Sequence, residues 1–171
     1  MGKLAADSIE NGDIVFIGAS TTNECLMKHI ENKRIRIITN SFYIFEQYKG
    51  NKDFELILTG GSWREKSGAF IGEITDRILA GIRVDKCFIG ANGIKDNNIT
   101  NSNKEEAGLQ KIIMNNSREN YVLIDSNKFD LKDLYTFYQT DKVNGIITDS
   151  GLNKNIKEKY GKYTEIINIA R

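Results

Sequence analysis

Short apolar runs that end abruptly in clusters of small polar residues recur along this chain. Six such runs, rich in Ile, Val and Phe, stand at residues 14–17, 35–38, 56–58, 87–89, 121–124 and 146–147. Runs of about four apolar residues are typical of parallel strands buried on both faces. Segments with helical spacing lie between them, so the pattern predicts an α/β fold, a mostly parallel multi-stranded sheet flanked by helices.

The same pattern sets the expected boundaries of each element. Helices are predicted over residues 4–10, 23–32, 41–49, 73–80, 103–116 and 151–160. Strands are predicted over residues 14–17, 35–38, 55–58, 86–89, 121–124, 145–148 and 164–169, and residues 130–140 are expected to be helical or irregular. The segments after residues 58 and 89 are interpreted as loops. No repeat or long linker divides the chain, so residues 1–171 are expected to form a single domain.

Composition narrows the function classes. Hydrophobic residues make up 40% and charged residues 27% of the chain, and the net charge of +1 gives no overall field that favours nucleic acid or membrane. The densest basic groups, residues 28–36 and 154–162, are interpreted as solvated helix faces. No run approaches the roughly 20 apolar residues of a membrane span, and the first residues lack a signal-peptide pattern. A cytoplasmic protein without membrane contact is expected.

Cysteine and histidine are scarce. Cys25 falls in a predicted helix and Cys87 in a predicted strand, without the CxxC spacing of a redox or metal site. Both are expected to be reduced, buried thiols. His29 is the single histidine and is expected at the surface, so no metal site and no cofactor are predicted.

The loop Gly18-Ala19-Ser20-Thr21-Thr22 joins the first strand to a helix. Free backbone N–H groups, hydroxyls and a positive helix end suit a phosphate or a carboxylate at such a junction. The loop matches neither GxxxxGK[ST] nor GxGxxG. A simple Ser/Thr helix cap is the alternative interpretation.

Two cations follow other strands and strengthen the case for an anion site. Lys128 comes after Asp125-Ser126-Asn127, and Arg64 comes after Gly60-Gly61-Ser62-Trp63. Charge-assisted hydrogen bonds to phosphate are the strong ones. Gly60 and Gly61 would let the backbone approach a ligand closely. Trp63 is expected either to stack on a sugar face or to pack in the core.

A further polar set surrounds the start of the helix near residue 103. Amide and carboxylate side chains of this kind read sugar hydroxyls, and a carboxylate can also act as a general base beside a carbonyl. For the two glutamates, complementation of the helix dipole is the alternative. The set comprises Asn92, Asn101, Asn103, Glu105 and Glu106.

Seven short segments resemble one known family in order and spacing. They are GASTT (18–22), ITNS (38–41), LTGGSWR (58–64), VDKCFIGANGI (84–94), ITNSNKEEA (99–107), LIDSNKF (123–129) and IITD (146–149). Together they resemble the C-terminal effector domain of DeoR-type repressors of sugar metabolism, from about Leu4 to Arg171. That family is distantly similar to ribose-5-phosphate isomerase and glucosamine-6-phosphate deaminase.

The resemblance implies a sensor that binds a phosphorylated sugar. It places the phosphate on Ser20, Thr21 and Thr22, with Lys128 and Arg64 assisting, and it places the sugar against Asn40, Asn92, Asn103 and Glu106. This chain departs from the family at two positions. Ser20 stands where relatives usually have a second glycine, and Asn92 stands where many have Asp, which weakens a catalytic interpretation.

The expected function is therefore a non-catalytic, homo-oligomeric effector domain. The family's N-terminal winged helix-turn-helix is not found here, so contact with DNA is expected only through that absent domain, and Met1-Gly2 resembles an expression start at a domain boundary. The alternative is a sugar-phosphate (aldose–ketose) isomerase with Glu105, Glu106 or Asp125 as its base. A third interpretation is a subunit-assembly domain with a vestigial pocket.

Overall fold

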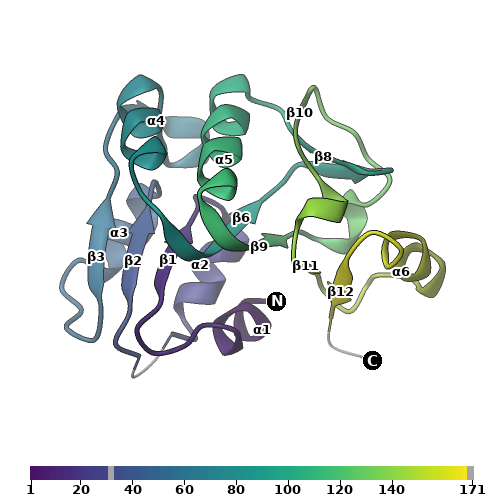
Figure 1. The fold of residues 1–171 in the computed structure, drawn as a ribbon, viewed down its shortest axis with the longest axis horizontal. Coiled ribbons are helices and arrows are strands. Elements are labelled where there is room, and N and C mark those ends of the chain that lie inside the picture. Colours follow the sequence, from purple (N-terminus) through teal and green to yellow (C-terminus); the bar gives the residue numbers. More distant parts are fainter. Residues whose placement is uncertain (31–32, 169–171) are drawn as a thin grey trace.

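The fold is organised around a parallel sheet (Figure 1). The computed structural model describes residues 1–30 and 33–168, and within these residues seven strands form that sheet. The predicted fold class is confirmed. In spatial order the strands are β12 (Glu165–Ile167), β11 (Gly145–Ile147), β9 (Ser117–Leu123), β6 (Val84–Gly90), β1 (Ile14–Ile17), β2 (Arg36–Thr39) and β3 (Glu55–Leu58).

The strand order reverses at β1. From β1 the chain builds outward to β2 and β3, then returns to the other side of β1 with β6 and continues to β9, β11 and β12. The register places Phe16 of β1 between Ile38 of β2 and Cys87 of β6. The gap between the carboxyl ends of β1 and β6 is therefore the topological switch point of the sheet.

Helices cover both faces of the sheet, which explains the continuous apolar runs. Along β1, Val15 and Ile17 face one core and Phe16 faces the other, because successive strand residues point to opposite sides. The first core packs against α1 (Gly2–Asp7), α2 (Thr21–Met27) and α3 (Phe42–Tyr48). The second packs against α4 (Glu73–Ala80), α5 (Lys104–Asn115) and α6 (Lys154–Tyr160), and Figure 1 shows α4 and α5 side by side.

Two small antiparallel sheets replace segments that were predicted as loops or left irregular. One pairs β4 (Ser62–Arg64) with β5 (Ala69–Ile71) around the short 3₁₀ turn η1 (Glu65–Ser67). The other joins β7 (Gly93–Lys95), β8 (Asn98–Asn101) and β10 (Tyr135–Gln139). The interpretation of the segments after residues 58 and 89 as loops was wrong where these strands form, and the prediction of helical or irregular structure at 130–140 was wrong for Tyr135–Gln139.

Helix ends differ from the predictions by a few residues, and at α6 a capping side chain accounts for the difference. Asn153 accepts a hydrogen bond from the backbone N–H of Ile156, so α6 begins at Lys154 and not at residue 151. Helix α2 begins two residues earlier than predicted and ends at Met27. Residues 31–32 of the predicted helix 23–32, and residue 169 of the last predicted strand, lie outside the described residues.

A buried ion pair closes the amino ends of β1 and β6. Lys86 Nζ lies 2.7 Å from Asp13 Oδ2, and neither side chain is more than 14% exposed. Burial lowers the pKa of Lys86, but the hydrogen bond and charge of Asp13 outweigh it and hold that pKa above its ordinary value. Asp85 Oδ2 also accepts a hydrogen bond from the backbone N–H of Ile14 (2.9 Å). The amino edge of the sheet is thus fixed by paired charges.

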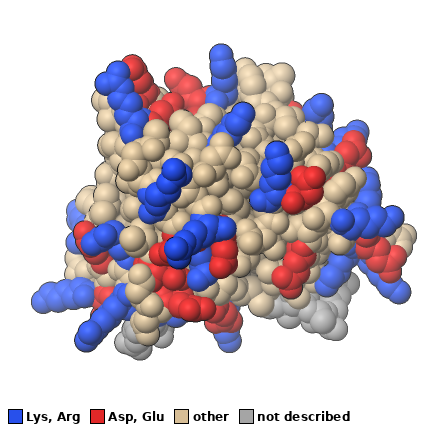
Figure 2. All heavy atoms as spheres, in the orientation of Figure 1, with Lys and Arg blue, Asp and Glu red and all other residues tan. Residues whose placement is uncertain are grey.

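The surface charges, the helix lengths and the two cysteines can be compared with what composition predicted. Basic and acidic side chains are interspersed over the face seen in Figure 2. Among the described residues, no helix combines the length and apolarity that crossing a membrane requires.

Cys87 is buried, whereas Cys25 is exposed, so the expectation of two buried thiols was wrong for Cys25. Its place on the outer side of the short helix α2 accounts for this.

Candidate functional site

A pocket of about 350 Å³ opens at the carboxyl ends of β1 and β6. Ligands of open α/β sheets bind at this kind of switch point, and pockets for small molecules typically start at about 300 Å³. The lining comes from the loop after β1, the loop after β6, the start of α5, the 3₁₀ turn η2 (Ser126–Lys128) after β9, and η1. Segments far apart in the sequence therefore meet at one edge of the sheet.

The loop after β1 presents hydroxyl groups to the pocket. Ser20 caps α2: its Oγ accepts a hydrogen bond from the backbone N–H of Asn23 (3.1 Å), which leaves the hydroxyl proton available to a ligand. Thr21 and Thr22 follow in the first turn and also line the pocket. A Cβ at Gly90 would stand 2.9 Å from Ser20 Cβ, so glycine is needed where β6 ends.

Two buried asparagines hold this loop in place. Asn23 Nδ2 donates to the carbonyl oxygens of Gly18 (2.8 Å) and Phe88 (3.1 Å). Asn40, just after β2, accepts a hydrogen bond from the backbone N–H of Ala19 at its Oδ1 (3.0 Å). Because both amides are nearly inaccessible to water, they fix the backbone of the hydroxyl loop.

Lys128 is one of two cations at the pocket that the sequence singled out. Its Nζ lies 3.9 Å from Asp125 Oδ2. The turn η2 that carries it is held by Asp149, whose Oδ2 accepts from the backbone N–H of Ser126 (2.7 Å). Burial raises the pKa of Asp149, but hydrogen bonds from Ser126 and Gly151 outweigh it and hold that pKa below its ordinary value. The carboxylate thus positions the turn that carries Lys128.

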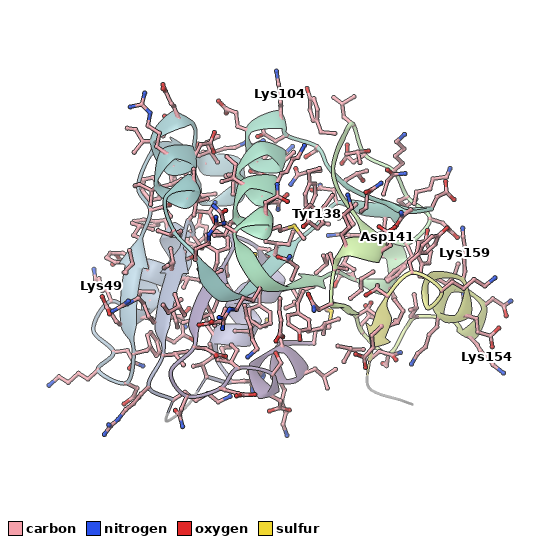
Figure 3. All side chains as sticks on the ribbon, in the orientation of Figure 1. Lys49, Lys104, Tyr138, Asp141, Lys154 and Lys159 are labelled. Carbon is pink, nitrogen blue, oxygen red and sulfur yellow. The ribbon has the colours of Figure 1, made fainter. Side chains whose placement is uncertain are left out.

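Arg64 is the second cation. It enters the pocket from β4, and its Nε lies 3.6 Å from Glu106 Oε1 of α5. That separation is an ion-pair contact but exceeds a hydrogen bond. Lys104 stands at the same end of α5, yet its side chain points away from the body of the protein (Figure 3). Position near a helix start alone therefore does not bring a cation into the pocket.

A chain of hydrogen bonds sets the first turn of α5. Gln110 Nε2 donates to the carbonyl oxygen of Gly90 (2.9 Å), and its Oε1 accepts from Asn101 Nδ2 (3.1 Å). Asn101 Oδ1 accepts from the backbone N–H of Asn103 (3.0 Å), and Asn103 Oδ1 accepts from the backbone N–H of Glu106 (2.9 Å). These hydrogen bonds fix the first turn of α5, and with it Glu106 on the pocket wall, to the end of β6.

Most of the residues predicted to bind ligand line this pocket, and four do not. Asn40 braces the hydroxyl loop, and its Nδ2 donates to the carbonyl oxygen of Phe70 (3.1 Å). Asn103 is the N-cap of α5. Gly60 and Gly61 turn the chain between β3 and β4 with positive φ angles of 66° and 120°. The predicted residues that line the pocket are Ser20, Thr21, Thr22, Arg64, Asn92, Glu106 and Lys128.

Sequence reasoning missed several residues of the lining. Tyr43 and residues 65–68 reach the pocket because β4 and β5 fold back beside α3, and no local signal predicted that hairpin. Gln110 carries no motif of its own, although it lies one turn beyond Glu106 on the helical face that meets the pocket. Asn101 belonged to the polar set around residue 103 but was not chosen as a ligand residue, and Ser102 next to it also lines the pocket.

The three carboxylates considered as catalytic bases occupy different places. Glu106 lines the pocket in contact with Arg64, whereas Glu105 and Asp125 are not part of the lining. Within residues 1–30 and 33–168, no three His, Cys, Asp or Glu side chains are grouped as a metal would require. Hydroxyls and amides dominate the pocket, together with three cations (Arg64, Lys66, Lys128) and three carboxylates (Glu24, Glu65, Glu106). Hydroxyls, amides and cations can bind the anionic part of a ligand, and carboxylates can accept hydrogen bonds from its hydroxyl groups.

A parallel sheet with such a pocket at its switch point is typical of domains that bind a small ligand. The family model described as "DeoR C terminal sensor domain" matches residues 1–150. The chain belongs to this family, whose members are sensor domains of transcriptional repressors and not enzymes. The resemblance read from the seven sequence segments is confirmed.

Curated relatives agree with the family match. The chain is 37% identical over 170 residues to the lactose phosphotransferase system repressor of Streptococcus mutans, 38% to that of Staphylococcus epidermidis and 35% to that of Lactococcus lactis. In each case the alignment covers 98% of this chain and 67% of the relative. The chain thus aligns with about two thirds of each of these repressors.

Solved structures show the same fold at low sequence identity. Ribose 5-phosphate isomerase A from Methanocaldococcus jannaschii superposes with a TM-score of 0.53 at 19% identity, over 75% of this chain and 51% of that one. The eIF2B delta subunit from Chaetomium thermophilum gives 0.59 at 14% identity, over 85% and 52%. The similarity to the isomerase fold expected from the sequence is confirmed for the architecture.

Proposed function

We propose that this chain is the effector-binding part of a DeoR-type regulator and that its pocket binds a phosphorylated sugar. The observation that carries the proposal is the convergence of the Ser20–Thr22 hydroxyls, Lys128 and Arg64 on one pocket at the switch point. The hydroxyl loop and Lys128 hold the phosphate, and Arg64 adds a second positive charge. Asn92 and Glu106 face the hydroxyl-bearing part of the ligand.

The proposed output is a change in DNA binding by a winged helix-turn-helix domain elsewhere in the whole protein. The family description, a C-terminal sensor domain, supports this arrangement. The relatives' name, lactose phosphotransferase system repressor, supports a sugar phosphate derived from sugar uptake as the effector. Coupling between an effector site and a second site is typically worth about 1–3 kcal/mol.

We further propose that the domain acts as a homo-oligomer in the cytoplasm. Ile74 and Ile78 support the first point, because they lie one turn apart on α4 and remain 62% and 39% exposed. Exposed apolar residues that adjoin one another on a helix are candidates for an interaction surface. Sedimentation of the purified chain tests this, and Ile74→Glu should lower the observed mass if α4 lies in the interface.

Phosphorus NMR tests effector binding directly. The chain is mixed with a panel of pentose and hexose monophosphates, and a resonance that shifts or broadens without a new product supports a sensor. A product peak that grows with time would instead indicate an isomerase. Unchanged spectra for the whole panel would refute the proposal.

A further inference from the structure

Two polar atoms on the pocket wall are buried and lack a hydrogen-bond partner among the residues that the structure describes. They are Ser67 Oγ on η1 and Glu106 Oε1 on α5. Buried polar groups are nearly always paired, so an unpaired group at a pocket needs a partner that the protein itself does not supply. The two atoms therefore mark a part of the wall that a bound molecule completes.

The backbone that carries Ser67 is held firmly in place. Strand β4 pairs with β5 along its whole length, and Trp63 of β4 packs edge-on against Phe42 of α3, with ring centroids 5.3 Å apart. At the other end of η1, a Cβ at Gly68 would stand 2.0 Å from the ring of Tyr43, so the chain there lies directly against α3. The Ser67 hydroxyl is thus presented to the pocket from a fixed position.

Glu106 is also held, through its backbone and through a partly buried ion pair. The hydrogen bonds of Asn103, Asn101 and Gln110 tie its turn of α5 to the end of β6. Arg64 Nε lies 3.6 Å from Glu106 Oε1, which is within ion-pair range but too far for a hydrogen bond. The side chains of Arg64 and Glu106 are only 22% and 17% exposed, so bulk water has little access to the space between them.

The spacing of Arg64 and Glu106 suits a hydroxyl group of a ligand. A carboxylate oxygen only accepts hydrogen bonds, and a guanidinium N–H only donates them. One hydroxyl oxygen about 2.8 Å from each atom would accept from Arg64 Nε and donate to Glu106 Oε1, and a separation of 3.6 Å permits both bonds. A phosphate oxygen can accept from Arg64, but it offers no proton to Glu106 and sets one negative charge against another.

We propose that Ser67, Arg64 and Glu106 select a hydroxyl-bearing part of the sugar and thereby restrict the effector to sugar monophosphates, against sugar bisphosphates. This inference rests on the proposed function, since it assigns the single phosphate to the Ser20–Thr22 loop and Lys128. Glu106 repels a second phosphate, and Ser67 and Arg64 supply hydrogen bonds that a hydroxyl can use. Specificity of this kind combines attraction for one ligand with repulsion of another.

Paired ligands test the selection. Titration calorimetry measures the affinity of each monophosphate in the panel and of the bisphosphate of the same sugar, for example fructose 6-phosphate and fructose 1,6-bisphosphate. The monophosphate of a pair should bind the wild type at least about tenfold more tightly. Glu106→Gln keeps the shape and an acceptor oxygen but removes the charge, so the ratio of the two affinities should fall below about threefold. Glu105→Gln is the matched control, because Glu105 is the neighbouring carboxylate outside the lining, and it should leave the ratio unchanged.

Ser67→Ala tests the hydroxyl on η1. It should weaken monophosphates roughly three- to tenfold, the effect of one lost hydrogen bond, and leave binding of inorganic phosphate unchanged. Ser62→Ala, an exposed serine of the adjoining strand outside the lining, is the control and should alter neither affinity. Thermal unfolding of each variant verifies that the fold is retained.

The outcomes separate this inference from the proposed function. Equal binding of a monophosphate and its bisphosphate, tighter binding of the bisphosphate, or an unchanged ratio in Glu106→Gln would refute the selection and leave a sugar-phosphate site in place. Unchanged affinity of Ser67→Ala for the monophosphate would overturn the role given to that hydroxyl. If no monophosphate and no bisphosphate binds, the proposed function itself fails, and the selection fails with it.

Discussion

Asn40 gives the sharpest test of how the pocket is held together. The resemblance to the family assigned it to the ligand, whereas the structure uses both ends of its amide inside the protein. The perturbation is Asn40→Ala. It removes the acceptor for the backbone N–H of Ala19 and the donor to the carbonyl oxygen of Phe70, and it leaves the side-chain site nearly closed to water.

The magnitude follows from those two hydrogen bonds. Leaving a buried backbone group without its hydrogen-bond partner costs about 1–3 kcal/mol. Small movements that let water reach the freed N–H and C=O groups should reduce this cost. The free energy of unfolding should therefore fall by about 2–4 kcal/mol, a large part of the roughly 5–15 kcal/mol of a typical domain. For a chain of this size the loss corresponds to a decrease in Tm of roughly 5–15 °C.

Urea denaturation measures this change, with the midpoint lowered and the m-value unchanged. Asn155→Ala is the matched control, because Asn155 is exposed on α6 and its replacement should alter the free energy of unfolding by less than about 0.5 kcal/mol. A stable Asn40→Ala variant that fails to bind sugar phosphate would refute the reasoning. Asn40 would then contact the ligand and not brace the loop.

Three other predictions concern the ligand, pH and the thiols. Lys128→Ala should weaken binding of the phosphorylated sugar roughly ten- to hundredfold in titration calorimetry, with Tm unchanged. The control Lys104→Ala should leave the affinity unchanged. Equal affinity of wild type and Lys128→Ala would show that Lys128 does not contact the ligand. Hydrogen bonds hold the pKa of Asp149 below its ordinary value of 3.8. The ionised carboxylate therefore stabilises the fold above pH 3.8. This stabilisation is lost as the pH falls through the lowered pKa. Below about pH 4 the Tm of the wild type should therefore fall more steeply than that of Asp149→Asn, and parallel curves would contradict this. A thiol reagent should label one cysteine in the native protein and two in urea, since Cys25 is exposed and burial raises the pKa of Cys87 to about 12; two native labels would show that β6 opens.

The central sheet could be predicted because its signal is local. Each parallel strand is a continuous apolar run such as Ile14–Ile17, and burial on both faces requires that pattern wherever the strand lies. The small antiparallel strands carry no such signal. Strand β10 gains its structure by pairing with β8 more than thirty residues earlier, and β4 consists of Ser62, Trp63 and Arg64 without apolar alternation. Pairing with a strand distant in the sequence decided β10, whereas β4 and β7 belong to local hairpins that lack a continuous apolar run.

The site could be predicted as far as strand ends determine it. Ser20 and Lys128 follow strands of one parallel sheet, so topology alone brings them to one edge. The direction in which each polar side chain points could not be predicted in the same way. Asn92 lines the pocket and Asn40 binds the backbone, although each stands within two residues of the end of a parallel strand. Only the position of neighbouring N–H and C=O groups separates a ligand-binding amide from a structural one.

The amino edge and the carboxyl edge of the sheet carry different kinds of residues. The Lys86–Asp13 pair and the Asp85 contact lie at the amino edge, whereas the pocket opens at the carboxyl ends of β1 and β6. Substitutions at the carboxyl edge therefore leave the main electrostatic anchor of the fold untouched. Under the proposed function, libraries randomised at Asn92 and Ser102 should yield folded variants with altered sugar preference. If the proposed effector binding holds, the domain is a scaffold on which carbohydrate biosensors can be built.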